Sequence, residues 1–542
     1  MTMMPQHLPG GYCFDGENFF HENREQAIAN FYLAPSKAYR LSDDPLPRFA
    51  DIEIVRSVGS TPLSQHTALD ELTAQWWKRL PPGCAYYPGA RGAARHLQTL
   101  FQLLLGQIEA VEVFQPTALG WTRLPSGEPV YITGSGGIGA NGFLPSDHVW
   151  VPEGLRTYRL EQASESSLAT ALNYFGALFG AIPGTTDILL TNTLSSLIFP
   201  CFKFAGIESR FPLVLEGPSE FKKTTLACLT SSIYNRKSTP RGCIATLTST
   251  KRALESRGAE LRHATLVFDD LFPDGGNATE RKMLELIRDV ANQLPREARS
   301  GSALTGAEME CGAVITAEYF PDCGLSTRTR CLRLVLTEPV PSSLLTPLQA
   351  TPELLGNVFA AFIAHVATHF DDISAKIKRD FQAYRAQRAQ ADEPLVKSER
   401  LAEIWFILCA TIQIFMEKFA PEELQDGGIF QDFQDWVSYK IKWQLSPEAL
   451  PQSDCVVALL PRIIRENQDL FLFRDGCACI SPAQLQDILQ RYYLHRIIPR
   501  QRIFDSLRRA NLLEMDQSGT STRKIKGRGR CLCINMHRLG WG

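Results

Sequence analysis

The stretch FPLVLEGPSEFKKTT, residues 211–225, constrains the fold of this chain more than any other part of the sequence. Residues 211–216 form an apolar run of strand length, residues 217–221 are rich in turn-forming types, and a helical pattern begins at Lys223. A loop that cradles phosphate requires this order of strand, loop and helix, because the N–H groups of the loop and of the first helical turn must point at one anion. The sequence therefore predicts an anion-binding loop here.

The spacing GxxxxKKTT, counted from Gly217, aligns with the phosphate-loop motif GxxxxGK[ST]. The alignment places Lys223 at the motif lysine and Thr224 at the hydroxyl that contacts Mg²⁺. Lys222 replaces the second glycine, so its side chain must either tolerate the backbone geometry of the loop or alter it. The alternative is an ordinary basic helix start after a turn. On the first interpretation the nucleotide-binding residues are Gly217, Pro218, Ser219, Glu220, Phe221, Lys222, Lys223, Thr224 and Thr225.

Two acidic residues and a threonine follow further strand patterns at the positions that a nucleotidase requires. Such an enzyme needs one carboxylate at the end of a neighbouring buried strand to hold Mg²⁺ and a second to polarise water. Asp269 and Asp270 directly follow the strand pattern at 264–268, with a strand at 243–247 and a helix after Ser249 on the way to it. Thr316 ends the strand pattern at 312–316, where it would sense the terminal phosphate or place the attacking water. This βαβαβ order predicts an α/β, AAA+ P-loop core.

Arginines near the end of this core are candidates for a site shared between subunits. Arg328 and Arg330 precede a last strand pattern at 331–336, and arginines on such a rim can reach the γ-phosphate of a neighbouring subunit. Arg296 and Arg299 are second choices. The alternative for each is a solvated arginine at a strand edge.

The length and composition predict a multidomain globular protein. The chain has 542 residues, which suggests three or four domains of ~150 residues. Its net charge is only −2, so any nucleic-acid surface must be local. The 14 cysteines show no CxxC and no Cys/His spacing typical of zinc sites, which indicates reduced thiols. We expect a cytoplasmic protein, because no signal peptide is evident and the apolar stretch at 401–419 carries four polar interruptions.

Pattern changes along the chain suggest five domains. The glycine-rich GSGGIG at 134–139 fits GxGxxG but lacks a following helix, so it is interpreted as a hairpin. Helical patterns are expected at 68–80 and 93–105, and a helix with Asn277 as its N-cap follows the acidic pair. Residues 385–397 are expected to form a linker or exposed loop. The predicted domains are a mixed α+β N-terminal domain at 1–95, a β-rich and helical region at 96–185, the ATPase core at 186–340, a helical region at 341–450 and a winged helix at 451–542.

The winged-helix prediction depends on the last ninety residues. Three helical patterns are followed by two strands expected around a turn at 518–519. Between Arg491 and Arg530 stand eleven lysines and arginines against three acidic residues, an excess typical of a DNA-binding surface. A winged helix used for protein contacts is the alternative. The predicted DNA-binding residues are Arg502, Arg508 and Arg509 of the recognition helix and Arg523, Lys524, Lys526, Arg528 and Arg530 of the wing.

These motifs together resemble a family of AAA+ ATPases found in replication proteins of bacterial mobile elements. That family includes the minichromosome-maintenance-like helicases of staphylococcal cassette elements. The resemblance covers roughly residues 100–340, and the winged helix is similar in placement. The segments that carry it are LGWTRLPSGEPVY at 119–131, GIG at 137–139, the loop at 217–225, residues 248–254, the pair Asp269 and Asp270, and VITAE at 314–318.

The resemblance implies roles for the site residues and a function for the chain. It implies that Lys223 and Thr224 bind the β- and γ-phosphates and Mg²⁺, that Asp269 holds the metal, and that Asp270 activates water in place of the usual glutamate. The expected function is an ATP-driven DNA motor, a ring-forming, hexameric helicase that replicates a mobile element and needs no membrane. Because Asp270 is one methylene shorter than glutamate, a nucleotide-sensing DNA-binding regulator or assembly factor with weak or no hydrolysis stays open as the alternative.

Overall fold

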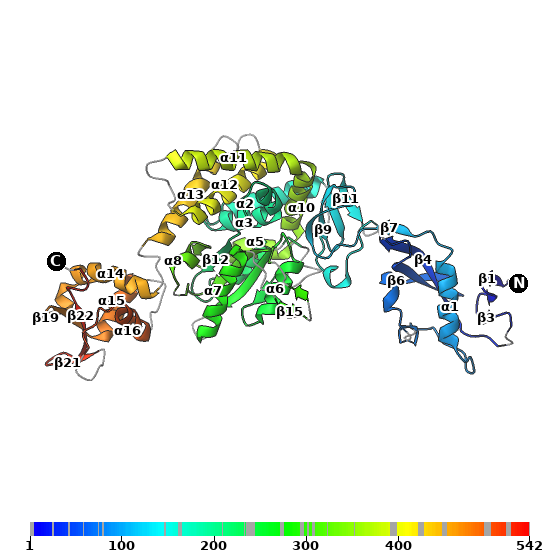
Figure 1. The fold of residues 1–542 in the computed structure, drawn as a ribbon, viewed down its shortest axis with the longest axis horizontal. Helices are drawn as coiled ribbons and strands as arrows, with labels where there is room; N and C mark the ends of the chain where they lie inside the picture. The colour runs from blue at the N-terminus through cyan, green and yellow to red at the C-terminus, as the bar shows by residue number, and fades with distance from the viewer. Residues whose placement is uncertain are drawn as a thin grey trace.

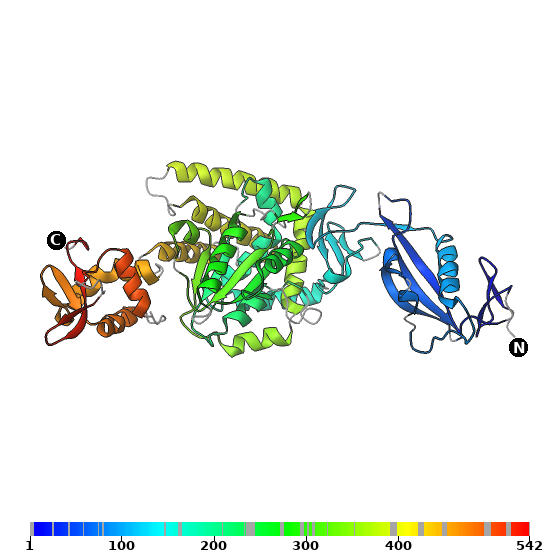
Figure 2. The ribbon, with the colours of Figure 1, turned by 60° about the horizontal axis from the view of Figure 1, so that its bottom comes forward.

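A computed structural model shows three bodies in a row, with the N-terminal part at one end and the C-terminal part at the other (Figures 1 and 2). The central body is the largest and carries the parallel sheet. The structure describes residues 5–23, 26–41, 44–57, 59–73, 75–78, 81–145, 148–160, 165–208, 210–231, 233–234, 244–271, 276–292, 298–300, 303–305, 309–321, 323–351, 353–390, 398–420, 428–446, 452–492, 500–515 and 522–540.

The N-terminal body consists of one mixed sheet and one small antiparallel sheet, which share a hydrophobic core with one helix. A four-stranded sheet of order β6-β5-β4-β7 covers α1 (Ala93–Leu105), whose Leu97, Leu100 and Phe101 are buried in the shared core. A second sheet joins three strands of three residues each, β1 (Gln6–Leu8), β2 (Tyr12–Phe14) and β3 (Phe19–His21). The larger sheet contains β4 (Tyr32–Leu41), β5 (Phe49–Arg56), β6 (Gly59–Ala68) and β7 (Val111–Val113).

The helix expected at 68–80 is wrong. The chain instead stays in β6 up to Ala68 and then makes two short 3₁₀ helices, η1 (Leu69–Glu71) and η2 (Trp76–Lys78). Pairing of β6 with β5 and burial of Trp77 against the core override the local helical pattern. The helix expected at 93–105 is confirmed.

A small antiparallel sheet lies between the N-terminal body and the helices of the central body (Figure 1). The GxGxxG stretch supplies its strand β10, which forms hairpins with both sequence neighbours, so the interpretation as a hairpin is confirmed. The sheet has the order β11-β10-β9-β8 and contains β8 (Gly120–Arg123), β9 (Pro129–Thr133), β10 (Gly136–Gly139) and β11 (Gly142–Pro145).

The central sheet has five parallel strands in the order β13-β14-β17-β12-β18. The strands predicted at the loop, the acidic pair and Thr316 are all present, and their residues up to the carboxyl ends are buried. The helix after the acidic pair begins at Gly276, so Asn277 lies inside it and is not its N-cap. The elements are β12 (Pro212–Glu216), α5 (Lys223–Ser231), β13 (Ile244–Thr246), α6 (Lys251–Glu260), β14 (Thr265–Leu271), α7 (Gly276–Asn292), β17 (Gly312–Ala317), α8 (Leu325–Arg328) and β18 (Leu332–Val335).

Helices on either side of this sheet share one hydrophobic core with it and with the small sheet of β8–β11. The core runs from Leu119 to Ile441, across three of the domains that the sequence suggested, whose boundaries stay predictions. The stretch expected as a linker at 385–397 is helical up to Gln390. The helices are α2 (Glu165–Phe179), α3 (Thr186–Leu197), α4 (Phe199–Phe204), α9 (Ser342–Ala350), α10 (Glu353–Thr368), α11 (Phe370–Gln390), α12 (Glu399–Phe419) and α13 (Gly428–Leu445).

Within the described residues, no single helix is long and apolar enough to cross a bilayer. The helices α10 and α11 meet the length and composition criteria only as a pair, and they are bent by 86°.

The C-terminal body packs three helices against a four-stranded sheet of order β19-β20-β22-β21. Ile503, Leu507 and Leu512, which recur at helical spacing in the sequence, are buried in its core. The hairpin turn lies between Ile525 and Gly529, whereas the turn expected at 518–519 falls outside the described residues. The elements are α14 (Gln452–Glu466), β19 (Leu472–Arg474), β20 (Cys477–Ile480), α15 (Pro482–Tyr492), α16 (Arg500–Arg509), β21 (Arg523–Ile525) and β22 (Gly529–Asn535).

Candidate active site

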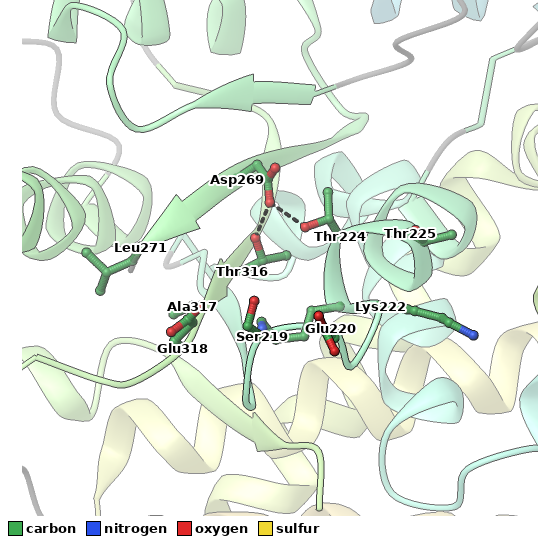
Figure 3. Close-up of a pocket in the computed structure, with 11 residues that line it drawn as sticks. Ser219, Glu220, Lys222, Thr224, Thr225, Asp269, Leu271, Thr316, Ala317 and Glu318 are labelled. Atoms are coloured by element: carbon green, nitrogen blue, oxygen red, sulfur yellow. Dashed lines mark hydrogen bonds between the residues drawn. The ribbon is translucent and has the colours of Figure 1, made fainter. Parts of the chain in front are cut away.

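The predicted loop leaves the carboxyl end of β12 and enters α5 at Lys223. Because β12, β14 and β17 are parallel, their carboxyl ends meet at the same edge of the sheet. The loop, the acidic strand and the polar-tipped strand therefore come together there (Figure 3). They line a pocket of about 300 Å³ at the N-terminus of α5.

The replacement of the loop glycine by Lys222 is accommodated by the backbone. Lys222 adopts a left-handed conformation with φ of 60°, and Glu220 does the same with φ of 68°. A left-handed conformation costs a residue other than glycine roughly 1 kcal/mol. The side chain of Lys222 points away from Asp269 (Figure 3), and its ammonium group donates to Ser342 Oγ at the start of α9. Lys222, which replaces the second glycine of the motif, thus adopts a backbone conformation that favours glycine.

Close contacts fix the two ends of the loop. A Cβ atom on Gly217 would lie 3.2 Å from Leu336 Cβ and 3.3 Å from the Leu336 carbonyl oxygen, so a side chain there would displace the strand end beside it. Lys223 Nζ donates to the Pro218 carbonyl across the loop, at 2.7 Å. The ammonium group is therefore held over the loop that the motif assigns to phosphate.

Two hydroxyls converge on one carboxylate in the pocket. Thr224 Oγ1 donates to Asp269 Oδ1 at 2.6 Å, and Thr316 Oγ1 donates to the same oxygen at 2.5 Å (Figure 3). Two oxygen ligands in adjacent positions of an octahedral Mg²⁺ site lie about 2.9 Å apart. The separation of the Thr224 and Asp269 oxygens is within a few tenths of an ångström of that value, so these two residues fit a magnesium site.

Three further residues line the pocket that the sequence interpretation did not assign: Leu271, Ala317 and Glu318. Glu318 matters most, because it brings a half-buried carboxylate into the pocket two residues after Thr316. The sequence offered one signal for Glu318: it lies two residues after Thr316, and residues i and i+2 of an extended segment face the same side. Asp270 follows Asp269 in β14, but its side chain lies outside the described residues.

A buried ion pair lies directly beneath the loop. Arg333 on β18 donates from Nε to Glu216 Oε1 at 2.6 Å and from Nη2 to Oε2 at 3.1 Å, and both residues are at most 1% exposed. Gln444 of α13 accepts from the Arg333 backbone N–H at 2.9 Å. The last residue of the strand before the loop is thereby bonded to β18, and β18 to a helix of the surrounding layer.

The candidate arginines differ in their surroundings. Arg328 is 7% exposed and lies in α8. Arg330 is half-buried, donates to Ser326, and has its pKa lowered by desolvation and by the charges of Arg400 and Arg288. Arg299 lies in β15 (Ala298–Ser300), which pairs with β16 (Ala303–Thr305), but its side chain lies outside the described residues, as does all of Arg296.

The predicted DNA-binding side chains also differ in their surroundings. Arg523 donates to the Met515 carbonyl and Arg528 to the Leu470 carbonyl, so both bind their own body. The other described side chains of the set, those of Arg508, Lys524, Lys526 and Arg530, are exposed. Arg502 and Arg509 lie in α16, and their side chains are outside the described residues.

Comparison with known proteins identifies the fold. No family model matches the sequence, and no curated protein matches it. A solved structure described as "SCCmec type IV Cch - active helicase" aligns with a TM-score of 0.55 at 15% identity, covering 98% of this chain and 99% of that one. A JCV helicase bound to a small molecule aligns over 47% of this chain and 74% of its own with a TM-score of 0.20 at 15% identity, too low to carry an argument. The chain thus has a helicase-like fold with a P-loop core, and the alignment extends over nearly its whole length.

Proposed function

We propose that this chain is an ATPase of the AAA+ kind that works as a DNA motor, a ring-forming replicative helicase of a mobile genetic element. The observation that carries the proposal is the convergence of Lys223, Thr224, Asp269 and Thr316 on one pocket at a helix N-terminus. Strand β17 lies between β12 and β14, so Thr316 sits between the phosphate loop and the acidic strand. This arrangement supports hydrolysis of a nucleoside triphosphate.

Each pocket residue has a role that its chemistry supports. Lys223 supplies a point charge to the β- and γ-phosphates, and the N–H groups at the start of α5 donate to the same anion. Thr224 and Asp269 would hold Mg²⁺, which neutralises charge on the phosphates. Asp270 is the proposed base for water, and Glu318 is a second carboxylate at the pocket rim that can take this role.

The position of Arg330 supports a site completed by a neighbouring subunit. Arg330 comes just before β18, and β18 runs parallel to β12, so the arginine lies at the sheet edge opposite the phosphate loop. About 13 Å of strand separates the two edges. The guanidinium group therefore serves a second copy of the chain better than its own pocket. Burial of Arg328 makes Arg330 the stronger candidate of the two.

The C-terminal body supports DNA as the partner. Lys524 and Arg530 lie directly opposite each other in the β21–β22 hairpin, both exposed. Like charges in directly opposed positions are destabilising unless an anion lies between them. Phosphate groups of a nucleic acid supply that anion, and the three helices with a basic hairpin support a winged helix.

The likeness to a solved helicase over 98% of the chain favours the motor over the alternative, a nucleotide-sensing DNA-binding regulator or assembly factor. The experiment that separates them measures ATP hydrolysis by the full chain with and without DNA, together with its oligomeric state by mass photometry. A motor predicts an oligomer whose turnover DNA stimulates, with Lys223→Ala as the inactive control. A regulator predicts ATP binding with no turnover that DNA stimulates, and that result would overturn the motor proposal.

A further inference from the structure

The N-terminal three-stranded sheet, β1-β2-β3, lacks the size to be stable on its own. Its strands β1, β2 and β3 have three residues each, and hairpins of this length are marginal in water without an additional constraint. One face of the sheet is accounted for, because Tyr12 and Phe14 are buried in the core that α1 helps to form. The other face therefore decides how the three strands are held together.

Cys13 lies between these two aromatic residues and so faces the opposite side. It is nevertheless only 2% exposed. His7 of β1 is its direct partner across the sheet, and Glu22, one residue after β3, approaches from the third strand. Each strand system thus contributes one side chain with a metal-binding atom to the same face.

The three donor atoms are close to one another. His7 Nδ1 and Glu22 Oε1 are 3.1 Å apart, Cys13 Sγ and His7 Nδ1 are 3.5 Å apart, and Cys13 Sγ and Glu22 Oε1 are 3.8 Å apart. Among the residues that the structure describes, this is the only group of three or more such donors that lie within 4.8 Å of one another.

These separations match a tetrahedral zinc ion. Zinc binds sulfur at about 2.3 Å, imidazole nitrogen at about 2.0 Å and carboxylate oxygen at about 2.1 Å. With tetrahedral angles, those bond lengths place nitrogen and oxygen about 3.4 Å apart and sulfur about 3.6 Å from either. The observed distances deviate from these values by no more than a few tenths of an ångström.

We propose that His7, Cys13 and Glu22 bind one Zn²⁺ and that this ion holds the three N-terminal strands together. A thiolate and an imidazole favour zinc over Mg²⁺ or Ca²⁺. The His7 and Glu22 side chains are 75% and 52% exposed, so the fourth position of the ion opens to solvent and takes water. The site is independent of the nucleotide pocket, which lies in the central body.

The test measures metal binding by the full chain in the absence of nucleotide. The chelator-stripped protein is titrated with Zn²⁺ under competition with a chromogenic chelator, and separately with Co²⁺ to detect the thiolate-to-cobalt charge-transfer band. We expect one ion per chain and a band that Cys13→Ser abolishes, with affinity for Zn²⁺ reduced at least a hundredfold. Cys84→Ser, a change at another thiol of the same body, should leave both readouts unchanged.

Milder variants keep the test decisive if Cys13→Ser does not fold. Glu22→Gln and His7→Asn retain size and polarity, and each should weaken Zn²⁺ binding at least tenfold with an unchanged circular dichroism spectrum. Asp269→Asn controls for metal at the nucleotide pocket and should keep the cobalt band. A wild-type protein that binds no Zn²⁺ in the titration, or variants that bind it as tightly as the wild type, would overturn the proposal and leave an ordinary His7–Glu22 ion pair above a thiol.

Discussion

In the nucleotide pocket, Asp269 binds two hydroxyls that lie 45 and 47 residues away in the sequence, each placed by a different buried element. In the β21–β22 hairpin, Lys524 and Arg530 lie opposite each other on adjacent strands only six residues apart in the sequence, and both are exposed. The pocket depends on where its atoms are, to within tenths of an ångström, and a buried sheet supplies that precision. Binding of DNA by the hairpin, as proposed, depends on how much positive charge the hairpin carries, because counterion release is insensitive to exact position.

This difference predicts that single changes damage the pocket and only summed changes damage the hairpin. It also separates the two adjacent lysines of the loop, since Lys223 bonds across the loop proposed to bind phosphate, whereas Lys222 bonds to Ser342 of α9. Substitutions in matched pairs test both differences.

The largest effect is expected for Lys223→Ala. Removing the ammonium group that lies over the loop should reduce ATP turnover about a thousandfold while the fold stays intact. Lys222→Ala is the matched control: it removes a lysine that points away from Asp269, and we expect less than about a tenfold loss. Steady-state hydrolysis assays with circular dichroism compare the two. Full activity of Lys223→Ala alongside an inactive Lys222→Ala would mean that the register of the loop is wrong.

A large loss of stability is expected when the ion pair beneath the loop is broken. Arg333→Ala leaves Glu216 buried and unpaired, which should lower the free energy of unfolding by about 3–5 kcal/mol. Arg462→Ala is the counterpart in the C-terminal body, where the pair with Glu466 is exposed, and it should produce no measurable change. Urea denaturation of both variants tests the contrast. Equal stabilities would show that the base of the loop does not depend on this pair.

An intermediate effect is expected from mixing two inactive proteins. If Arg330 completes a neighbour's site, Arg330→Ala alone is inactive, and a random mixture with Lys223→Ala rebuilds about a quarter of the sites. Turnover of the mixture is compared with that of each variant alone. Arg328, Arg296 and Arg299 variants are tested in the same way, and absence of rescue for all four arginines would contradict a shared site.

The smallest change per residue is expected in the hairpin. Neutralising Lys524, Lys526 and Arg530 should weaken DNA binding equally for all sequences and reduce the log–log salt slope by about 0.9 for each phosphate that the hairpin no longer neutralises. Hydrolysis without DNA should persist, because the hairpin is not part of the pocket. Arg508→Ala, an exposed change in α16, should instead alter sequence preference if this helix reads bases. Fluorescence anisotropy at two salt concentrations gives the affinity for DNA and its salt slope. An unchanged slope would favour the alternative, a winged helix used for protein contacts.

The sequence predicted those parts of the fold in which local pattern and tertiary environment agree. The apolar run before Gly217 and the helical pattern from Lys223 gave β12 and α5, because buried parallel strands and amphipathic helices carry strong local signals. Asp269 was located because it directly follows the apolar run of such a strand, although β14 itself continues to Leu271. The helix expected at 68–80 failed because Ala68 is paired with β5 and Trp77, in a short 3₁₀ helix, is buried in the core.

Site features that arise from three-dimensional pairing were not predictable in this way. The left-handed conformation of Lys222 is set by the loop closing between β12 and α5, and residue type argued against it. The hairpin turn between Ile525 and Gly529 was not predicted, whereas the turn expected at 518–519 falls outside the residues that the structure describes. His7 precedes Cys13 by six residues and Cys13 precedes Glu22 by nine, a spacing that does not match a known zinc motif. Only the pairing of the strands brings the three side chains together.

The central claim, that hydrolysis in the pocket drives movement on DNA held elsewhere in the molecule, is tested most directly by strand displacement. The full chain is incubated with a forked DNA duplex carrying a fluorophore and a quencher, with ATP and Mg²⁺ or with a nonhydrolysable ATP analogue. The account predicts strand separation with ATP only, none with Lys223→Ala, and separation that falls as salt rises. ATP hydrolysis without strand separation, or separation that persists in Lys223→Ala, would contradict it.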